Sequence, residues 1–453
     1  MLAHLFNTLL HKAFTLSTLS LYNERSYQQE IHDLVQKSFS QGGAFDAQQD
    51  NVALFNFGFD QARLARIIAR AVRRGTYRLS PPQKRLILNK NKSRAVYDYA
   101  LTDKIVIKVF SRYLHALFKP FMVPELYSYQ PGKNAGMAVQ QLGQYIRSTR
   151  RQLSIKGLYV LKVDIQSYSD SIFIGEQSSL WPRLTTLLKD SLRAADMALL
   201  REMIRPSYLS KDGGLQTNVR GVTTGSPISN FLYNFYCAPV DGLFAHSPGL
   251  FYARFSDDIL LCHPDPLELL QQAERLYAEL ARLQLRVHPQ KIMQYYLSPA
   301  GNASNIELFQ GKNSFDYLGY RIDGYGQITL SERRKRYFLR AIFRRIRYSH
   351  DLLKNTGVDE ATRIRSICQV VNNALLERDF LEGEIRSLIM ESNDQGQLKH
   401  LDYLIALNIA MRITNIHGVK AFARLPYKAL RTTYGLCSLI KLRNRNSESI
   451  PLV

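Results

Sequence analysis

Apolar residues recur at helical spacing near the N-terminal end of the chain. Residues 60–74 contain an apolar stripe flanked by arginines, and Gly75 is a typical stop for such a helix. The stripe comprises Leu64, Ile67, Ile68 and Val72. Residues 1–24 have one Lys and no acid before Glu24, and we interpret them as an amphipathic helix rather than a secretion signal. The pattern predicts a helical N-terminal region over residues 1–75.

A mixed pattern of strands and helices follows as far as residue 330. Two short strands joined by a polar Lys-Asn turn are predicted first, then a helix, a strand rich in β-branched and aromatic residues, a buried helix, a hairpin, an amphipathic helix and two more strands. The corresponding ranges are 83–98, 103–121, 157–166, 226–244, 251–262, 266–285, 315–323 and 326–330. This order is typical of an α+β fold with helices packed on one face of an antiparallel sheet.

From Ser331 onward the chain is helical and basic. Eight Lys and Arg residues lie between Arg333 and Arg347, around an apolar stripe. The stripe comprises Phe338, Ile342, Phe343 and Ile346. The changes of pattern predict three regions, 1–75, 76–330 and 331–453, without a flexible linker between them.

The composition predicts a folded protein with a polyanionic partner. The 453 residues are 45% hydrophobic, with 60 Lys and Arg against 38 Asp and Glu, a formal charge of +22. Such a surplus favours nucleic acid as partner, although a merely basic protein is the simpler alternative. The four cysteines form no CxxC pair, which argues for a reducing, cytoplasmic location and against structural zinc. No apolar run reaches the ~18 residues that a membrane span needs.

Two adjacent aspartates lie inside an otherwise apolar segment. Asp257 and Asp258 separate FYARF from ILLC, and for this fragment alone a solvated turn is the simpler interpretation. Asp164, however, ends a second predicted strand, YVLKVD. Three carboxylates at one edge of a sheet would suit two Mg²⁺ ions, with Mn²⁺ as the alternative, in phosphoryl-transfer chemistry.

Around these carboxylates, the motifs over residues 80–330 resemble those of bacterial reverse transcriptases, such as the enzymes of group II introns, retrons and phage-defence systems. In chain order they are NKNKSRAV, YALTDKIVIKVFSRYL, LYSYQPGKNAGMAV, VDIQSYSDSI, RGVTTGSPISNFLYNFYCAPVD, FYARFSDDILL, LQLRVHPQKI and FDYLGYRI. Each motif is weak alone, but eight in the family's order are specific. The resemblance implies a right-hand polymerase, with fingers and palm over residues 76–330, a helical thumb and C-terminal region over 331–453, and a helical N-terminal part.

The resemblance also implies roles for individual residues. The catalytic residues would be Asp164, Asp257, Asp258 and Lys291, the last protonating pyrophosphate. The metal ligands would be Asp164, Ile165, Asp257 and Asp258. The substrate-binding residues would be Lys92, Arg94, Ser169, Thr224 and Gly225. Arg344, Arg345 and Arg347 of the thumb would contact the phosphate backbone of bound nucleic acid.

Three departures from the family pattern fall in this implied site. Phe255 and Ser256 replace the Tyr and the small apolar residue of Y-A-D-D, and Thr224 replaces the Gln of P-Q-G. Ser169 stands five residues after Asp164, where the family has a bulky ring that excludes the ribose 2′-hydroxyl. Two interpretations are open: sugar discrimination is weakened, or Tyr168 or another side chain fills the space.

We therefore predict an RNA-directed DNA polymerase that extends a 3′-hydroxyl and acts in antiphage defence with a dedicated non-coding RNA. Its partners would be that RNA, the DNA product and dNTPs, and a homo-oligomer or a partner protein is left open. The alternatives are a template-independent or protein-primed DNA polymerase and a non-catalytic RNA-binding scaffold. A viral-type RNA polymerase fits less well, because Ser229 and Asn234 follow Gly225 at +4 and +9, the spacing of reverse transcriptases.

Overall fold

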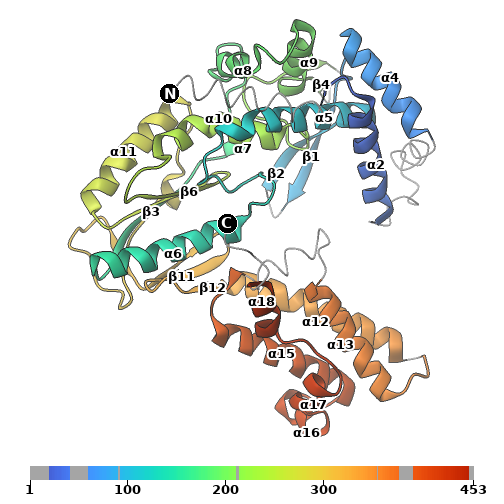
Figure 1. Cartoon of the computed structure of the whole chain (residues 1–453), viewed down its shortest axis with the longest axis vertical. Coiled ribbons are helices and arrows are strands. Elements are labelled where there is room, and N and C mark those ends of the chain that lie inside the picture. Colours follow the sequence, from blue (N-terminus) through green and yellow to red (C-terminus); the bar gives the residue numbers. More distant parts are fainter. Residues whose placement is uncertain are drawn as a thin grey trace.

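The computed structural model describes residues 20–40, 60–89, 92–210, 214–354, 356–376 and 391–447, with a few side chains at the edges of these ranges left aside. The helix predicted over residues 1–24 falls mostly outside this part of the chain. Figure 1 shows two lobes, an upper one with the sheets and most helices of the first 330 residues, and a lower one made of helices from the C-terminal third.

A five-stranded sheet forms the centre of the upper lobe, in the order β6-β7-β3-β8-β9. Its strands are β3 (Leu158–Asp164), β6 (Phe251–Phe255), β7 (Asp258–His263), β8 (Met293–Leu297) and β9 (Gln310–Lys312). β3 pairs antiparallel with both β7 and β8. The predicted strand at 157–166 and the predicted hairpin at 251–262 are therefore confirmed, and they are neighbours.

Both faces of this sheet are buried. Alternate residues of β3 point to opposite sides, as strand geometry requires: Tyr159, Leu161 and Val163 join one apolar core, and Leu158 and Val160 join another. Helices cover the first face, whereas α6 (Ala135–Leu153) and a three-stranded sheet cover the second. That small sheet comprises β10 (Ser314–Tyr317), β11 (Tyr320–Asp323) and β12 (Ile328–Leu330). The expectation of helices on one face only was therefore incomplete.

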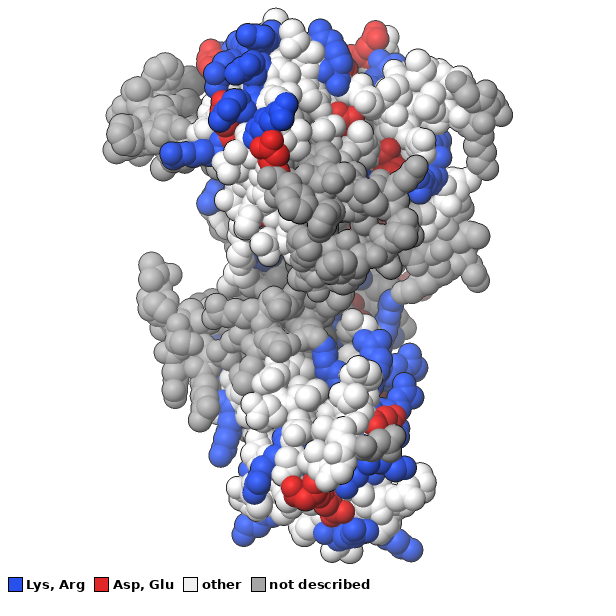
Figure 2. Space-filling view, turned by 90° about the vertical axis from the view of Figure 1, so that its right-hand side faces the viewer, with Lys and Arg blue, Asp and Glu red and all other residues white. Residues whose placement is uncertain are grey.

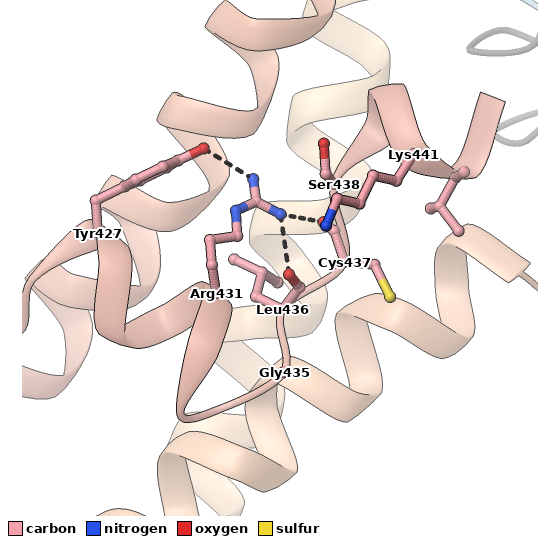
Figure 3. A pocket seen from close by; sticks show the side chains of 8 residues that line it. Tyr427, Arg431, Gly435, Leu436, Cys437, Ser438 and Lys441 are labelled. Atoms are coloured by element: carbon pink, nitrogen blue, oxygen red, sulfur yellow. Dashed lines mark hydrogen bonds between the residues drawn. The ribbon is translucent and has the colours of Figure 1, made fainter. Parts of the chain in front are cut away.

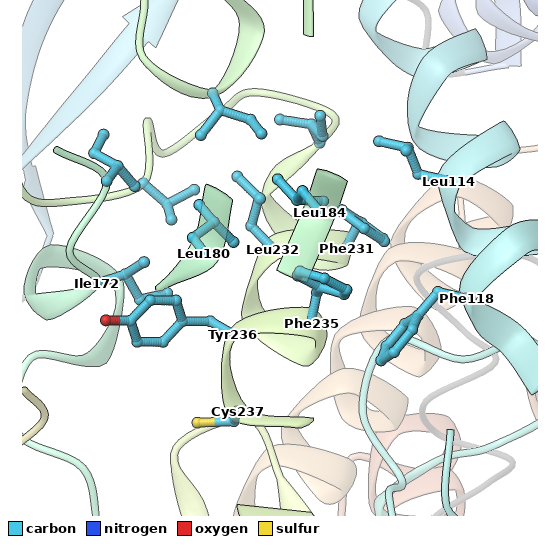
Figure 4. Close-up of a cluster of buried hydrophobic side chains, with 14 of the residues drawn as sticks. Leu114, Phe118, Ile172, Leu180, Leu184, Phe231, Leu232, Phe235, Tyr236 and Cys237 are labelled. Atoms are coloured by element: carbon cyan, nitrogen blue, oxygen red, sulfur yellow. The ribbon is translucent and has the colours of Figure 1, made fainter. Parts of the chain in front are cut away.

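The first core is organised around the buried helix α10 (Ser229–Phe244). Figure 4 shows Phe231, Phe235 and Cys237 of this helix among leucines of α8 (Leu180–Leu188) and residues of α5 (Leu101–Phe118). Phe231 and Phe235 stack with their ring centroids 5.3 Å apart.

The other helices of the upper lobe are α2 (Glu24–Ser40), α4 (Gln61–Arg74), α5 (Leu101–Phe118), α7 (Tyr168–Ser171), α8 (Leu180–Leu188), α9 (Ala194–Ile204) and α11 (Pro266–Arg282). Among the described residues, short 3₁₀ turns lie in the upper lobe, η2 (Lys119–Phe121) and η3 (Pro289–Lys291), and in the lower lobe, η4 (Gly418–Lys420).

Helix α4 confirms the predicted N-terminal helix with one correction. It ends at Gly75, whose φ of 70° is the left-handed conformation that glycine adopts without strain. Ile68 and Val72 are buried as expected, but the Ile67 side chain is 56% exposed. The buried stripe instead includes Ala65 and Ala69, because small residues let this helix approach its neighbours closely.

A four-stranded sheet, in the order β2-β1-β4-β5, projects beside α5 (Figure 1). Its strands are β1 (Gln83–Asn89), β2 (Lys92–Asp98), β4 (Ser207–Leu209) and β5 (Leu215–Thr217). β1 and β2 form the predicted hairpin, with Ile87 opposite Arg94. We call this hairpin the fingers hairpin.

The lower lobe begins at α12, directly after β12, so the predicted boundary near residue 330 falls between these two elements. Its helices are α12 (Glu332–Lys354), α13 (Glu360–Leu376), α15 (Gln395–Thr414), α16 (Ala421–Arg424), α17 (Tyr427–Thr432) and α18 (Leu439–Ser447). The first turn of α15 and the chain before it are hydrogen-bonded to β12: the Ile328 amide donates to Asn393 Oδ1 (2.6 Å), and the Leu330 amide donates to Gln397 Oε1 (2.7 Å). These bonds anchor the helical lobe to the sheet.

Among the described residues, no helix is long and apolar enough to cross a membrane.

Candidate active site

The three predicted carboxylates meet at one edge of the five-stranded sheet. Asp164 ends β3 and Asp258 begins β7, and the strand register places them directly opposite each other. The Ile165 amide donates to the Asp257 carbonyl (3.0 Å), which fixes the turn of the hairpin against the end of β3. The sheet therefore brings together residues that are more than 90 positions apart in the sequence.

Two lysines neutralise part of this negative charge. Lys291 Nζ lies 2.7 Å from Asp164 Oδ1, and Lys162 Nζ lies 3.4 Å from Asp258 Oδ1. Lys291 is positioned by the η3 turn, which follows a hydrogen bond from the His288 amide to the Asp164 carbonyl (2.8 Å). The structure thus places the predicted Lys291 beside Asp164, and it adds Lys162, which the sequence motifs did not single out.

Burial and mutual repulsion make the ionised carboxylates costly. Burial raises the pKa of Asp257, and the charges of Asp258 and Asp164 raise it further. Burial also raises the pKa of Asp258, against the opposing effect of Lys162. A divalent cation relieves such repulsion, and carboxylate oxygens are the ligands that Mg²⁺ prefers, so the residues present fit a metal site.

In the described part of the chain, no three Asp, Glu, His or Cys side chains converge closely enough to surround a single ion in this conformation. Two of the three carboxylates are instead held in the ion pairs with Lys291 and Lys162. Binding of metal would therefore require these side chains to rotate, which needs no movement of the strands.

The sequence matches the reverse transcriptase (RNA-dependent DNA polymerase) family over residues 84–322, which is more than half of the chain. This range includes all three carboxylates and the whole five-stranded sheet that carries them. The chain belongs to the reverse transcriptase family. It is therefore an RNA-directed DNA polymerase, an enzyme of the nucleotidyltransferase class.

Solved structures with a similar fold include telomerases of two yeasts. Apo telomerase from Candida tropicalis, truncated from its C-terminal domain, is 13% identical, with 56% of each chain covered and a TM-score of 0.43. Apo telomerase from the same species is 11% identical, with 77% of this chain and 68% of that chain covered and a TM-score of 0.45. Telomerase from Candida albicans in complex with a TWJ fragment of telomeric RNA is 13% identical, with 84% and 68% covered and a TM-score of 0.43. Among curated protein sequences, no match is found.

The predicted nucleotide-binding turn of this reverse transcriptase lies against the fingers hairpin. The Tyr97 amide donates to the Thr224 carbonyl (3.0 Å), and a Cβ atom on Gly225 would stand 3.1 Å from Val96 Cγ1. Gly225 also has a φ of 96°, so a side chain would be strained there. The turn is thus in contact with β2, the strand that also carries Lys92 and Arg94. The side chains of Lys92 and Arg94 lie outside the described part.

The Tyr168 side chain packs into the first core of the upper lobe. Its ring is buried, and its hydroxyl donates to the Tyr233 carbonyl in α10 (2.5 Å). Ser169 is half-buried, and its carbonyl accepts a hydrogen bond from the Val222 amide (2.8 Å). A second ring, that of Tyr233, lies 5.7 Å from the Tyr168 ring; burial raises the pKa of Tyr233 to about 12, and the Ser229 and Thr224 side chains oppose this rise. Tyr233 is therefore the other side chain that could take over exclusion of a ribose.

A cleft of about 620 Å³ lies beside Asp257 and Asp258, and the predicted thumb arginines do not line it. Arg344 and Arg347 are exposed and Arg345 is half-buried on α12, but the residues of this helix that line the cleft are Arg334 and Tyr337. Ten residues of helix correspond to about 15 Å. Arg344 thus stands about 15 Å further along the thumb than Arg334. Figure 2 shows Lys and Arg far outnumbering acids on the lower lobe from this side.

A second cavity, of about 370 Å³, lies among the C-terminal helices (Figure 3). Its central group is Arg431, which pairs with Asp402 (2.9 Å), donates to the Leu436 and Cys437 carbonyls and contacts the Tyr427 hydroxyl. These partners engage both terminal nitrogens of the guanidinium, so we interpret Arg431 as a residue that holds α15, α17 and the loop before α18 together.

Ser128 and Asn234 fall in the family-like motifs, but the sequence did not predict that they and Arg254 hold the catalytic hairpin from behind. Ser128 Oγ accepts a hydrogen bond from the Ser256 amide (2.9 Å), and Asn234 donates to the Ser128 carbonyl (2.8 Å). Arg254 is buried in β6 and donates to the Ser256 carbonyl (3.1 Å). The one available signal was an arginine inside an otherwise apolar strand, because a buried charge requires a partner.

Proposed function

We propose that this reverse transcriptase adds deoxynucleotides to a 3′-hydroxyl by a two-metal mechanism centred on Asp164, Asp257 and Asp258. The observation that supports this most strongly is the pairing of Asp164 with Asp258 across β3 and β7, together with the amide bond from Ile165 to Asp257. It holds three carboxylates at one edge of the sheet, where Asp257 and Asp258 line an open cleft of about 620 Å³.

In the proposed reaction, the 3′-oxygen of the primer attacks the α-phosphorus of the incoming nucleotide. A new P–O bond forms, the bond between the α-phosphorus and its bridging oxygen breaks, and pyrophosphate leaves. When bound by Asp164, Asp257, Asp258 and the backbone of Ile165, two divalent cations would favour the ionised 3′-oxygen and stabilise charge on the phosphates. Lys291, now paired with Asp164, would give its proton to the departing pyrophosphate.

The remaining residues of the site would position the nucleotide. Thr224 and Gly225 form a turn against β2, so the triphosphate would lie between this turn and the fingers hairpin, within reach of Lys92 and Arg94. Positioning of this kind supplies much of the rate enhancement in phosphoryl transfer.

We further propose that the enzyme is cytoplasmic and acts in antiphage defence, copying a dedicated non-coding RNA. The support is the resemblance of its motifs to bacterial reverse transcriptases and the changes at Ser169, Thr224 and Ser256, which suit a specialised enzyme rather than a general copier. The formal charge of +22 supports a nucleic-acid partner.

Sequencing the nucleic acid that co-purifies with the full chain tests the template proposal. One abundant RNA species, and a cDNA complementary to it after addition of dNTPs, is the expected result. A random mixture of cellular RNAs, with no complementary cDNA, contradicts the proposal of a dedicated template. Protection of cells against phage by the wild-type chain, lost in Asp257→Asn, is the result expected for the defence role.

A protein-primed, template-independent polymerase is the second candidate. It is favoured by Tyr337, which lines the cleft and is 50% exposed, so that its hydroxyl could replace a primer end. DNA that stays attached to the protein after denaturation, in the wild type but not in Tyr337→Phe, would identify this activity.

A further inference from the structure

Two hydroxyl groups lie next to the catalytic turn, in the cleft of about 620 Å³. The Ser256 Oγ and the Tyr129 hydroxyl are 3.3 Å apart, so one can donate to the other. Ser256 directly precedes Asp257, and both residues line the cleft. Tyr129 is 39% exposed, so its hydroxyl is open to a ligand.

The surrounding structure holds this pair rigidly. Ser256 and Tyr129 have φ values of 60° and 53°, a conformation that residues other than glycine adopt only when their surroundings impose it. The Ser256 amide donates to Ser128 Oγ, and Ser128 is in turn fixed by Asn234. The Tyr129 ring lies 5.6 Å from that of Tyr233.

Three hydroxyl-bearing residues take part in this arrangement. Ser256 stands where Y-A-D-D has a small apolar residue. Ser128 and Tyr129 are adjacent and lie more than 120 positions before Ser256, yet Ser128 Oγ accepts a hydrogen bond from the Ser256 amide and the Tyr129 hydroxyl is paired with Ser256 Oγ. Each hydroxyl is thus part of one polar network beside Asp257 rather than an isolated change.

The position of the network points to the sugar at the end of the primer. The reacting 3′-oxygen must come within reach of Asp257, and the 2′-carbon is its neighbour on the same ribose. A hydroxyl beside Asp257 is therefore well placed to meet a 2′-hydroxyl, which both donates and accepts hydrogen bonds and distinguishes RNA from DNA.

The walls of the cleft favour the primer over the incoming nucleotide. The described residues that line it come from the loop before α6, the catalytic hairpin, the β10–β11 turn and α12, for example Leu318 and Arg334. None of them comes from the fingers hairpin or from the turn at Thr224, which are the parts proposed to hold the triphosphate.

We propose that Tyr129 and Ser256 form a recognition site for the 2′-hydroxyl of the primer's 3′-terminal nucleotide, so that the enzyme extends RNA 3′-ends in preference to DNA 3′-ends. This inference rests on the proposed polymerase function. It adds a substrate class, a ribonucleotide-terminated primer, that the family assignment does not specify.

The test compares two primers of the same DNA sequence that differ only in a ribo- or deoxyribonucleotide at the 3′-end. Single-turnover addition of one dNTP is measured for the full-length wild type, Tyr129→Phe, Ser256→Ala and the control Tyr325→Phe, an exposed tyrosine outside the cleft. We expect a ribo-to-deoxy rate ratio of several-fold to about tenfold in the wild type and the control, the size of one hydrogen bond. The ratio should fall towards one in both cleft variants.

Equal rates on both primers in the wild type, or an unchanged ratio in both cleft variants, would overturn the inference. A changed preference for NTP over dNTP with an unchanged primer ratio would also overturn it, because the pair would then contact the incoming sugar. A chain that extends neither primer contradicts the polymerase function instead. In that case binding of the two primer–template duplexes by Asp257→Asn, measured by fluorescence anisotropy, still reports whether the terminal 2′-hydroxyl is recognised.

Discussion

Arg254 and Asp241 form a buried, two-pronged ion pair directly behind the catalytic turn. Arg254 Nε lies 2.7 Å from Asp241 Oδ1, and Nη2 lies 2.6 Å from Oδ2, with both side chains almost fully buried. The third nitrogen, Nη1, donates to the Ser256 carbonyl (3.1 Å). The pair therefore ties α10 to the turn that carries Asp257.

Replacing Asp241 with Asn should leave the Arg254 charge buried without its counter-ion. Removal of one partner of such a pair costs about 3–5 kcal/mol of the free energy of unfolding, which chemical denaturation measures. Arg254→Lys should also lower polymerase activity, since a lysine cannot reach Asp241 and the Ser256 carbonyl together. Unchanged stability in Asp241→Asn would contradict the role of the pair.

A change at Ser169 tests sugar discrimination at the incoming nucleotide. If no ring excludes the ribose, the wild type incorporates NTPs with only modest discrimination, and Ser169→Phe should raise the preference for dNTPs. Steady-state incorporation of matched dNTP and NTP pairs measures this preference. A strong dNTP preference in the wild type that Ser169→Phe leaves unchanged would contradict weakened exclusion of ribose at Ser169.

Tyr233 distinguishes the two interpretations of that position. The Thr224 side chain of the nucleotide-binding turn lowers the pKa of Tyr233, against the larger effect of burial, which raises it. If Tyr233 has taken over the exclusion of ribose, Tyr233→Ala should relax dNTP preference, whereas the Ser169 variant has little effect. Tyr168→Phe, which removes only a buried hydroxyl, serves as the control.

The thumb arginines should make binding of nucleic acid depend on salt. Replacing Arg344, Arg345 and Arg347 with Gln should weaken RNA–DNA duplex binding and reduce the slope of log affinity against log salt by up to about 0.9 for each lost phosphate contact. The matched control removes three exposed arginines of α4, Arg63, Arg66 and Arg70. An equal change of slope in both triple variants would argue against a specific role for α12.

Glu391 should make the stability of the protein depend on pH. Burial raises its pKa from 4.5 to about 7, so the folded protein holds this proton more tightly than the unfolded chain. The free energy of unfolding should therefore fall as the pH rises from about 4.5 to 7, by at most about 1.4 kcal/mol per pH unit, and then level off. Glu391→Gln should remove this part of the pH dependence. An identical pH profile for the variant would show that another group causes it.

Local patterns were sufficient to predict the elements that carry the site. The β-branched and aromatic residues of β3 and the two apolar runs around Asp257 predicted the strands correctly, and the match of motif order predicted the family. Helix α4 shows the limit of this reasoning, since the exposure of Ile67 depends on which neighbours the helix meets.

The contacts that hold the site could not be predicted in the same way. Ser128 and Asn234 are 106 residues apart, and no periodicity links them. The pairing of Lys162 with Asp258 depends on strand register, which a single sequence does not determine for distant strands. The residues of the three-stranded sheet were predicted as two strands, 315–323 and 326–330, but a turn at Leu318 and Gly319 divides the first into β10 and β11. The position of this sheet over the second face of the central sheet was not predicted.

Single-turnover primer extension on an RNA template with Mg²⁺ tests whether Asp257 is part of a metal-dependent polymerase site. Asp257→Asn preserves the size of the side chain, and Asp316→Asn, in an exposed ion pair of β10, is the matched control. We expect a loss of at least about 10³-fold in the rate for Asp257→Asn, an unchanged rate for Asp316→Asn and equal melting temperatures for both. Extension by folded Asp257→Asn at the wild-type rate would contradict a catalytic role of Asp257.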